Sequence, residues 1–221
     1  MTTVIFDLFE TLITEWGHEK YTTRKKAGDL NIPYETLADL WSEMEHSMDM
    51  GTLTLDEAIK YVVHKLSLPI TPELIDYIWQ RRINTRSVCF TNIDNNVIAM
   101  LDGLKAQGYQ FGLISNCSFE DAGMFRKSEL FPYFDLCILS CEVGMTKPSA
   151  KIYDLFCKTA KVKPEDCLFV GDGGSHELQG ASGFGMKTVQ AVWFIKEYNN
   201  EYINKDGFSY ASEPKEIFGY L

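Results

Sequence analysis

The sequence VIFDLFETLIT, residues 4–14, places one acidic residue directly after a strand-like apolar run. Residues 4–6 are types that favour a β-strand, and Asp7 follows them without a turn. An ionised carboxylate at the edge of an apolar core costs several kcal/mol unless a partner offsets its charge. We therefore expect Asp7 to face a cation that is supplied elsewhere in the chain.

Length, charge and cysteine content limit the classes of protein that fit. The 221 residues suffice for one hydrophobic core and a smaller second domain. A net charge of −10 argues against nucleic-acid and anionic-membrane partners, although a local basic pocket still permits an anionic substrate. No stretch reaches the roughly 20 apolar residues of a membrane helix, and the opening residues MTTVIF do not resemble a signal peptide. Six cysteines without a CxxC pair favour reduced thiols and a cytoplasmic protein.

Residues 15–86 have the pattern of helices throughout. Apolar residues recur every three or four positions across residues 37–48. Thr54 and Glu57 have the spacing of a capping box, and Thr71-Pro72 is typical of a helix start. We therefore predict an all-helical block in this part of the chain.

From residue 88 onward, short apolar segments alternate with amphipathic ones. The segments with strand character are YQFGLIS (109–115), DLCILS (135–140), CLFV (167–170) and KTVQAV (187–192). Nearly continuous apolar strands separated by helices are typical of a parallel sheet covered on both faces. With residues 4–6 as the first strand, the chain is predicted to form a Rossmann-like, doubly wound α/β sheet.

The helical block interrupts this sheet and is therefore predicted to be an insertion. Residues 1–14 and 87–221 would form the α/β core domain, and residues 15–86 an all-helical domain. The segment 193–210 follows the last clear strand, and we expect it to form a surface excursion before a short final helix.

Polar residues follow four of the predicted strands: Asp7, Ser115, Lys147 and Asp172. Because ligands of open α/β sheets bind beyond the carboxyl ends of the strands, these side chains should converge on one crevice. Asp7 would then face the ammonium group of Lys147 and share a metal cation with Asp172.

This combination of groups suits phosphoryl transfer. Two carboxylates with backbone oxygens and water suit Mg²⁺, a hard cation. A small hydroxyl and the N–H groups of a strand-to-helix turn suit a phosphate, and Lys147 can offset negative charge on it. A carboxylate nucleophile beside a metal and a phosphate points to an aspartyl-phosphate intermediate.

At these residues the sequence resembles the haloacid dehalogenase superfamily. The four motifs of that superfamily are matched in order by Asp7 with Thr11, Ser115, Lys147-Pro148, and Gly171-Asp172 with Glu177. The resemblance covers the whole chain, and the helical insertion is similar to the cap domain of the family. Four motifs in the right order are a far more specific signal than any one of them alone.

The resemblance implies a role for each motif residue. Asp7 would be the nucleophile of a phosphatase that acts on a small phosphorylated metabolite. Mg²⁺ would be held by Asp7, Asp172 and the backbone carbonyl of Phe9, with Glu177 in support.

The same resemblance implies that the phosphoryl group is bound by three residues: Ser115, Asn116 and Lys147. The cap domain would close over the pocket and exclude water during the transfer.

Three positions depart from the pattern of the family phosphatases. Phe9 stands where they carry an aspartate that acts as general acid, and Glu10 stands where they often carry glycine. Glu177 stands where the final acid is usually aspartate. Because Phe9 has no proton to give, the water that hydrolyses the intermediate needs another base, and Glu10 and His176 are the candidates.

Phe9 also supports a second interpretation. Family members that dehalogenate 2-haloacids carry an aromatic residue there and need no metal, but they tend to lose the acid that Asp172 supplies here. They also hold the substrate carboxylate with a cap arginine, and residues 29–50 contain none. A third interpretation is a catalytically weakened binding or regulatory protein that keeps the pocket but lacks the acid.

Overall fold

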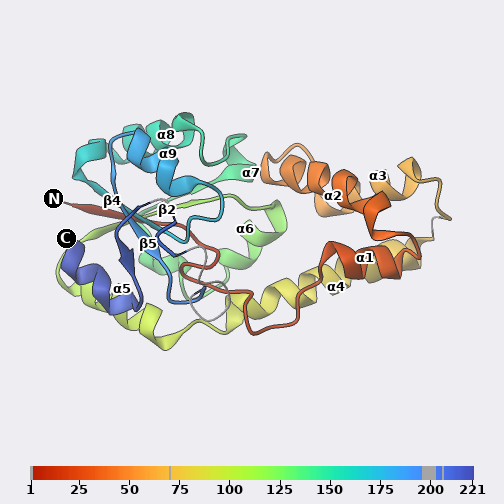
Figure 1. The fold of residues 1–221 in the computed structure, drawn as a ribbon, viewed down its shortest axis with the longest axis horizontal. Coiled ribbons are helices and arrows are strands. Elements are labelled where there is room, and N and C mark those ends of the chain that lie inside the picture. The colour runs from red at the N-terminus through yellow and green to blue at the C-terminus, as the bar shows by residue number, and fades with distance from the viewer. Residues whose placement is uncertain (1, 70, 196–202, 206) are drawn as a thin grey trace.

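A parallel β-sheet forms the centre of the larger of two lobes in the computed structural model, which describes residues 2–69, 71–195, 203–205 and 207–221 (Figure 1). Its strands are β1 (Thr3–Phe6), β2 (Gln110–Ser115), β3 (Leu136–Leu139), β4 (Cys167–Gly171), β5 (Lys187–Ala191) and β6 (Tyr210–Ala211). Every pair of neighbours is parallel, in the order β3-β2-β1-β4-β5-β6. The doubly wound α/β fold predicted from the sequence is thus confirmed.

The strands are apolar along their length because both faces of the sheet are covered. In β1, Val4 and Phe6 point into one hydrophobic cluster, whereas Ile5 points into the other. This alternation follows from the two-residue period of a strand. The register pairs Phe6 with Val170, so the polar residues after β1 and β4 begin at the same level of the sheet.

Helices cover the sheet on each face. The helices of the larger lobe are α5 (Asn95–Ala106), α6 (Phe119–Phe125), α7 (Ser140–Val143), α8 (Ala150–Ala160) and α9 (Glu177–Gly183), with 3₁₀ turns η1 (Phe131–Tyr133), η2 (Pro164–Asp166) and η4 (Pro214–Tyr220). Helices α8 and α9 pack in the cluster that contains Ile5, and α5, α6 and η4 pack in the cluster that contains Val4 (Figure 1).

Helices are the only regular secondary structure in the described residues of the smaller lobe, which has a hydrophobic core of its own. This helical lobe, residues 15–86, contains α1 (Thr23–Asp29), α2 (Tyr34–Asp49), α3 (Leu55–Lys65) and most of α4 (Pro72–Thr91). The predicted capping box of Thr54 and Glu57 begins α3, and Thr71 caps α4 with proline at its first position. The predicted boundary between residues 86 and 87 falls inside α4, so one helix continues from the lobe into the core.

The helical lobe rests directly on the core at the start of the loop after α2. Gly51 has a φ of +68°, and a Cβ atom there would lie 1.8 Å from the carbonyl oxygen of Cys141 in α7. The backbone N–H of Leu55 donates to the Glu120 carboxylate of α6 at 3.1 Å. Main-chain contact therefore joins the lobe to the core.

The C-terminal segment returns to the sheet instead of only crossing the surface. Tyr210–Ala211 add the strand β6, which the sequence pattern did not predict, and the short final helix is the 3₁₀ turn η4. Residues 196–202 and 206 of the predicted excursion lie outside the described residues. The part of the chain that the structure describes contains no helix with the length and apolar character of a membrane crossing.

Candidate active site

The carboxylate of Asp7 lies at the carboxyl end of β1 and is buried. The backbone N–H of Asp7 donates to Val170 O at 2.8 Å, which extends the pairing of β1 with β4 by one residue. The ammonium group of Lys147, also buried, donates to Asp7 Oδ1. Burial raises the pKa of Asp7 to about 6, although Lys147 acts in the opposite direction. Lys147 is therefore the cation that the sequence predicted for Asp7.

A reciprocal pair of hydrogen bonds joins the loops that follow β2 and β3. The Asn116 side chain donates from Nδ2 to Lys147 O at 3.1 Å and accepts at Oδ1 from the Lys147 N–H at 2.8 Å. Ser115 is fully buried, and its hydroxyl has only a long contact of 3.4 Å to Asn116 O. The three residues predicted to bind the phosphoryl group are thus held beside Asp7, with the Ser115 hydroxyl weakly engaged.

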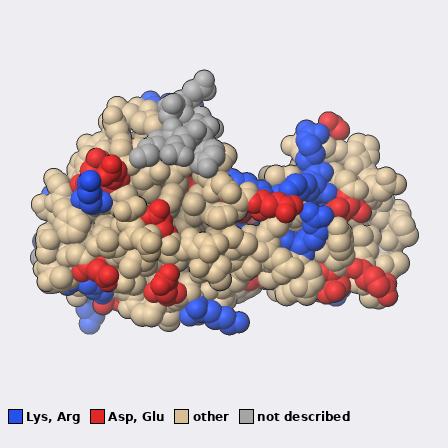
Figure 2. Space-filling view, turned by 90° about the horizontal axis from the view of Figure 1, so that it is seen from below, with Lys and Arg blue, Asp and Glu red and all other residues tan. Residues whose placement is uncertain are grey.

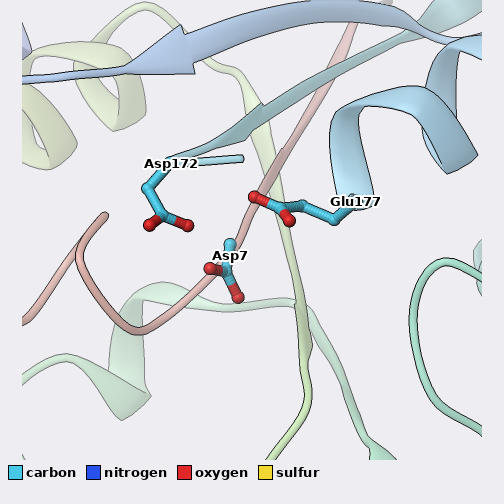
Figure 3. A group of neighbouring side chains, drawn as sticks. All are labelled: Asp7, Asp172 and Glu177. Atoms are coloured by element: carbon cyan, nitrogen blue, oxygen red, sulfur yellow. The ribbon is translucent and has the colours of Figure 1, made fainter. Parts of the chain in front are cut away.

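Asp7, Asp172 and Glu177 bring their carboxylates together, with one oxygen of each within 4.8 Å of the others (Figure 3). Burial, followed by the charges of Glu177 and Asp7, raises the pKa of Asp172 to about 8. Burial also opposes ionisation of Glu177, but Lys147 and the surrounding N–H groups outweigh it, and the pKa of Glu177 lies below its ordinary value.

Glu177 is held by the loop that follows β4. It accepts from the N–H groups of Gly173 at 2.5 Å and Ser175 at 2.8 Å, and from the Ser175 hydroxyl at 3.0 Å. A Cβ atom at Gly171 would lie 2.8 Å from Glu177 Oε1. The glycine before Asp172 therefore leaves the space that the longer acid occupies.

The chemistry of the cluster fits a divalent cation. Three carboxylates and one ammonium group have a formal charge of −2 when all are ionised. Only oxygen ligands are available, which suits a hard ion such as Mg²⁺. The raised pKa values of Asp7 and Asp172 show how unfavourable it is to ionise both without such an ion. The contribution of the Phe9 carbonyl remains a prediction.

The Phe9 side chain packs toward the helix that returns from the lobe. The guanidinium carbon of Arg86 lies 4.0 Å from the centre of the Phe9 ring, and the Phe90 ring meets it edge-on at 6.0 Å. Arg86 also binds Glu15 at 2.6 Å and Asp121 at 2.9 Å. Arg86 thus joins the lobe, the core and position 9.

The sequence comparison identifies the family of the protein. A family model described as haloacid dehalogenase-like hydrolase matches residues 1–185 of the chain. The chain belongs to the haloacid dehalogenase-like hydrolases. Among curated relatives, it is 24% identical to the glyceraldehyde 3-phosphate phosphatase of Methanothermobacter thermautotrophicus, over 97% of this chain and 98% of that protein.

Solved structures of haloacid dehalogenase-like hydrolases share the fold. A family enzyme of Bacteroides thetaiotaomicron in complex with magnesium and inorganic phosphate has a TM-score of 0.64 at 20% identity, over 86% of this chain and 94% of that one. A 2-haloacid dehalogenase of Pseudomonas syringae has a TM-score of 0.69 at 19% identity, over 99% of this chain and 97% of that one.

Two residues were predicted to compensate for Phe9 in this haloacid dehalogenase-like hydrolase. Glu10, with φ +55°, accepts from Thr14 Oγ1 at 2.5 Å and from the Glu15 N–H at 3.0 Å. Its carboxylate therefore stabilises the segment that leads from the core into the helical lobe. His176 lies with Asp172 in the lining of a cavity of about 240 Å³. His176 thus shares a cavity with Asp172, and the role of either residue as the base stays a prediction.

Sequence reasoning missed two cations of this hydrolase. The sequence pattern did not show that Arg86 joins the lobe to the core or that Lys26 is buried. The Lys25 side chain is 42% exposed, whereas that of Lys26 is 3% exposed. The aromatic residues Tyr21 and Trp41, whose rings face Lys26, were the available signal.

Proposed function

We propose that the chain is a Mg²⁺-dependent phosphatase that transfers the phosphoryl group of a small phosphorylated metabolite to Asp7. The observation that carries this proposal is the retention of Asp172 beside Asp7, in a cluster whose charge a divalent cation would balance. The similarity to a protein named glyceraldehyde 3-phosphate phosphatase, over nearly all of both chains, also supports it.

Phosphoryl transfer would begin with Asp7. Its pKa of about 6 leaves the carboxylate mostly ionised at neutral pH, and Lys147 fixes its orientation. As a carboxylate oxygen of Asp7 forms a bond to phosphorus, the bond from phosphorus to the leaving oxygen breaks. Water then attacks phosphorus and releases inorganic phosphate and the free Asp7 carboxylate.

The remaining residues of the site would stabilise charge. Ser115, Asn116 and Lys147 would bind the oxygens of the phosphoryl group. Mg²⁺ held by Asp7, Asp172 and the Phe9 carbonyl, with Glu177 in support, would neutralise charge on those oxygens.

A metal-independent dehalogenase is the second candidate, and Phe9 is the observation that favours it. A dehalogenase would use the same attack by Asp7, on carbon instead of phosphorus. Asp172 disfavours this reaction, because burial and the charges of Glu177 and Asp7 raise its pKa to about 8, and a substrate that needs no metal gives this unfavourable carboxylate no role.

Turnover of acetyl phosphate and p-nitrophenyl phosphate, with and without Mg²⁺, tests the proposal. We expect Mg²⁺-dependent release of phosphate that Asp172→Asn abolishes. The exposed residue Asp166 provides the matched control, and Asp166→Asn should leave the rate unchanged. Metal-independent release of halide from 2-chloropropionate would favour the dehalogenase, and binding of phosphate without any turnover would favour a binding protein.

A further inference from the structure

A cavity of about 400 Å³ lies between the helical lobe and the core. Lys and Arg side chains gather on the helical lobe next to the hollow between the two lobes (Figure 2). The lining residues that matter here are Lys26, Glu45, Asp49, Arg82, Arg86 and Asn116. Because the Asn116 side chain is hydrogen-bonded to the backbone of Lys147, the cavity adjoins the proposed phosphoryl site. Its volume is in the range of small-molecule sites.

Two cationic side chains in this cavity have N–H groups that donate to no described residue. The Arg82 side chain is 15% exposed and hydrogen-bonds to no residue in the described part of the chain; Glu45, its nearest acid, is 3.9 Å away. Lys26 donates one hydrogen bond, to Tyr21 O at 2.9 Å, and lies 4.0 Å from Glu45. Unfilled donors in a buried pocket favour a ligand rich in acceptors, and the planar guanidinium of arginine matches a carboxylate.

Glu45 partly offsets the charges of Lys26 and Arg82, but at 4.0 and 3.9 Å it lies beyond hydrogen-bond distance of either one. Arg86 compensates Glu15 and Asp121, and Glu45 accepts from Trp41 Nε1 at 2.7 Å. Asp49 makes neither a hydrogen bond nor an ion pair with the described residues, and it is an open acceptor for a hydroxyl group.

The helices set the order of these groups along the cavity. Asp49 ends α2 close to the contact of the lobe with the core, and Arg86 on α4 binds the core directly. Glu45 and Arg82 lie four residues earlier on their helices, which places them about 6 Å, slightly more than one helical turn, farther along the helix axis from the core. From the phosphoryl site outward, a ligand would meet first Asp49 and then the pair of Lys26 and Arg82.

We propose that this cavity binds the far end of a short phosphorylated hydroxy acid, with Lys26 and Arg82 on its carboxylate and Asp49 on its hydroxyl group. The inference rests on the phosphatase function proposed above, and it assigns the class of substrate to that site.

The test compares two substrates that differ in one group. 3-Phosphoglycerate carries a carboxylate where glycerol 3-phosphate carries a neutral CH₂OH group, and both have alkyl leaving groups. The ratio of their kcat/KM values in the wild type should favour the acid by about 10- to 100-fold, the worth of a charged hydrogen-bonded pair. Arg82→Gln should bring this ratio close to one.

Arg81→Gln is the matched control, because Arg81 lies next in the same helix but binds Glu19, Asp29 and Tyr77 on the surface. It should leave the ratio unchanged. A wild-type ratio near one, or equal ratios in the wild type and Arg82→Gln, would overturn the assignment.

Binding without turnover separates this inference from the proposed function. In an Asp7→Asn background, calorimetric titration with 3-phosphoglycerate should show affinity that falls about 10-fold or more on Arg82→Gln. If acetyl phosphate is not hydrolysed but this difference persists, the phosphatase function is wrong and the carboxylate site stands. If the two affinities are equal, the carboxylate site is wrong, whether or not the protein hydrolyses phosphate esters.

Discussion

Replacing Lys26 by methionine should make the protein more stable. Its ammonium group is buried in the helical lobe, and burial, followed by the charges of Arg82 and Arg86, lowers the pKa of Lys26 to about 8. A lysine with so low a pKa is charged at pH 7 only at a cost to the folded state. Methionine has a similar length without the charge, and it can keep the contact with the Trp41 ring.

The size of the effect follows from the pKa of Lys26. The fall from 10.5 to about 8 corresponds to about 3 kcal/mol of unfolding free energy. Methionine loses the hydrogen bond to Tyr21 O, which removes about 1 kcal/mol of this gain. A net gain of about 2 kcal/mol should raise the melting temperature by about 4–8 °C for a chain of this length.

The pH dependence provides the decisive measurement. Below pH 8, Lys26 is charged in the folded and unfolded states, and the folded state bears the full cost. Between pH 8 and 10.5 the folded state loses the proton first, so the cost disappears. The advantage of Lys26→Met should thus be full at pH 7 and small at pH 10.

Thermal unfolding of the wild type, Lys26→Met and Lys25→Met at both pH values checks this. Lys25 is the neighbouring lysine with an exposed side chain, and solvent screens its pair with Glu19, so its replacement should change stability little. A lower melting temperature for Lys26→Met at pH 7, or an advantage that persists at pH 10, would refute the reasoning. A confirmed gain would mean that Lys26 is kept at a cost in stability, as expected of a binding residue.

The remaining predictions concern the carboxylate cluster and position 9. Asp7→Asn should lower phosphate release from acetyl phosphate by several orders of magnitude with the fold intact by circular dichroism, and a variant with a tenth of the wild-type rate would contradict its role as nucleophile. Mg²⁺ should raise the melting temperature by mass action, by about 2.7 kcal/mol of stability at 100 times its Kd; no rise, or a rise that survives in Asp172→Asn, would count against the metal site. Because the pKa of Asp172 is about 8 and the metal must displace its proton, the affinity for Mg²⁺ in calorimetry should increase from pH 6 to pH 8, and a flat profile would mean that Asp172 is not a ligand. Aryl and acyl phosphates should turn over about 10²–10⁴-fold faster than alkyl phosphates, and equal rates would show that another residue donates the proton that Phe9 lacks. Phe9→Asp should restore only part of the rate on alkyl phosphates, because Arg86 would hold the new carboxylate ionised.

The parts of the fold that sequence predicted are those with local signals. The apolar strands, the capping box at Thr54 and the helix start at Thr71-Pro72 each depend on residues within a few positions of one another. The meeting of Asp7 with Lys147, 140 residues later, was also predictable, because the carboxyl ends of parallel strands share one edge of the sheet.

The surroundings of Lys26 and Arg86 were not predictable in this way. Nothing in the run Arg24-Lys25-Lys26 distinguishes the buried lysine from its exposed neighbours, because its burial depends on α2 and α4. The role of Arg86 depends on Asp121, 35 residues later, and on the direction in which the Phe9 ring points. The strand β6 has only two residues, too few to show a period.

The contact of Gly51 with Cys141 also fixes the distance between the helical lobe and the core. Because backbone meets backbone there, no rotamer change can bring the lobe closer to the core, and any side chain at position 51 would hold it farther away. The span from the carboxylate cluster to Arg82 is thus set by the main chain and not by the residues that line the cavity. The number of carbon atoms between the two ends of an accepted ligand would follow from that single glycine, so substitutions at position 51 should change which chain length fits while every side chain in the cavity stays the same.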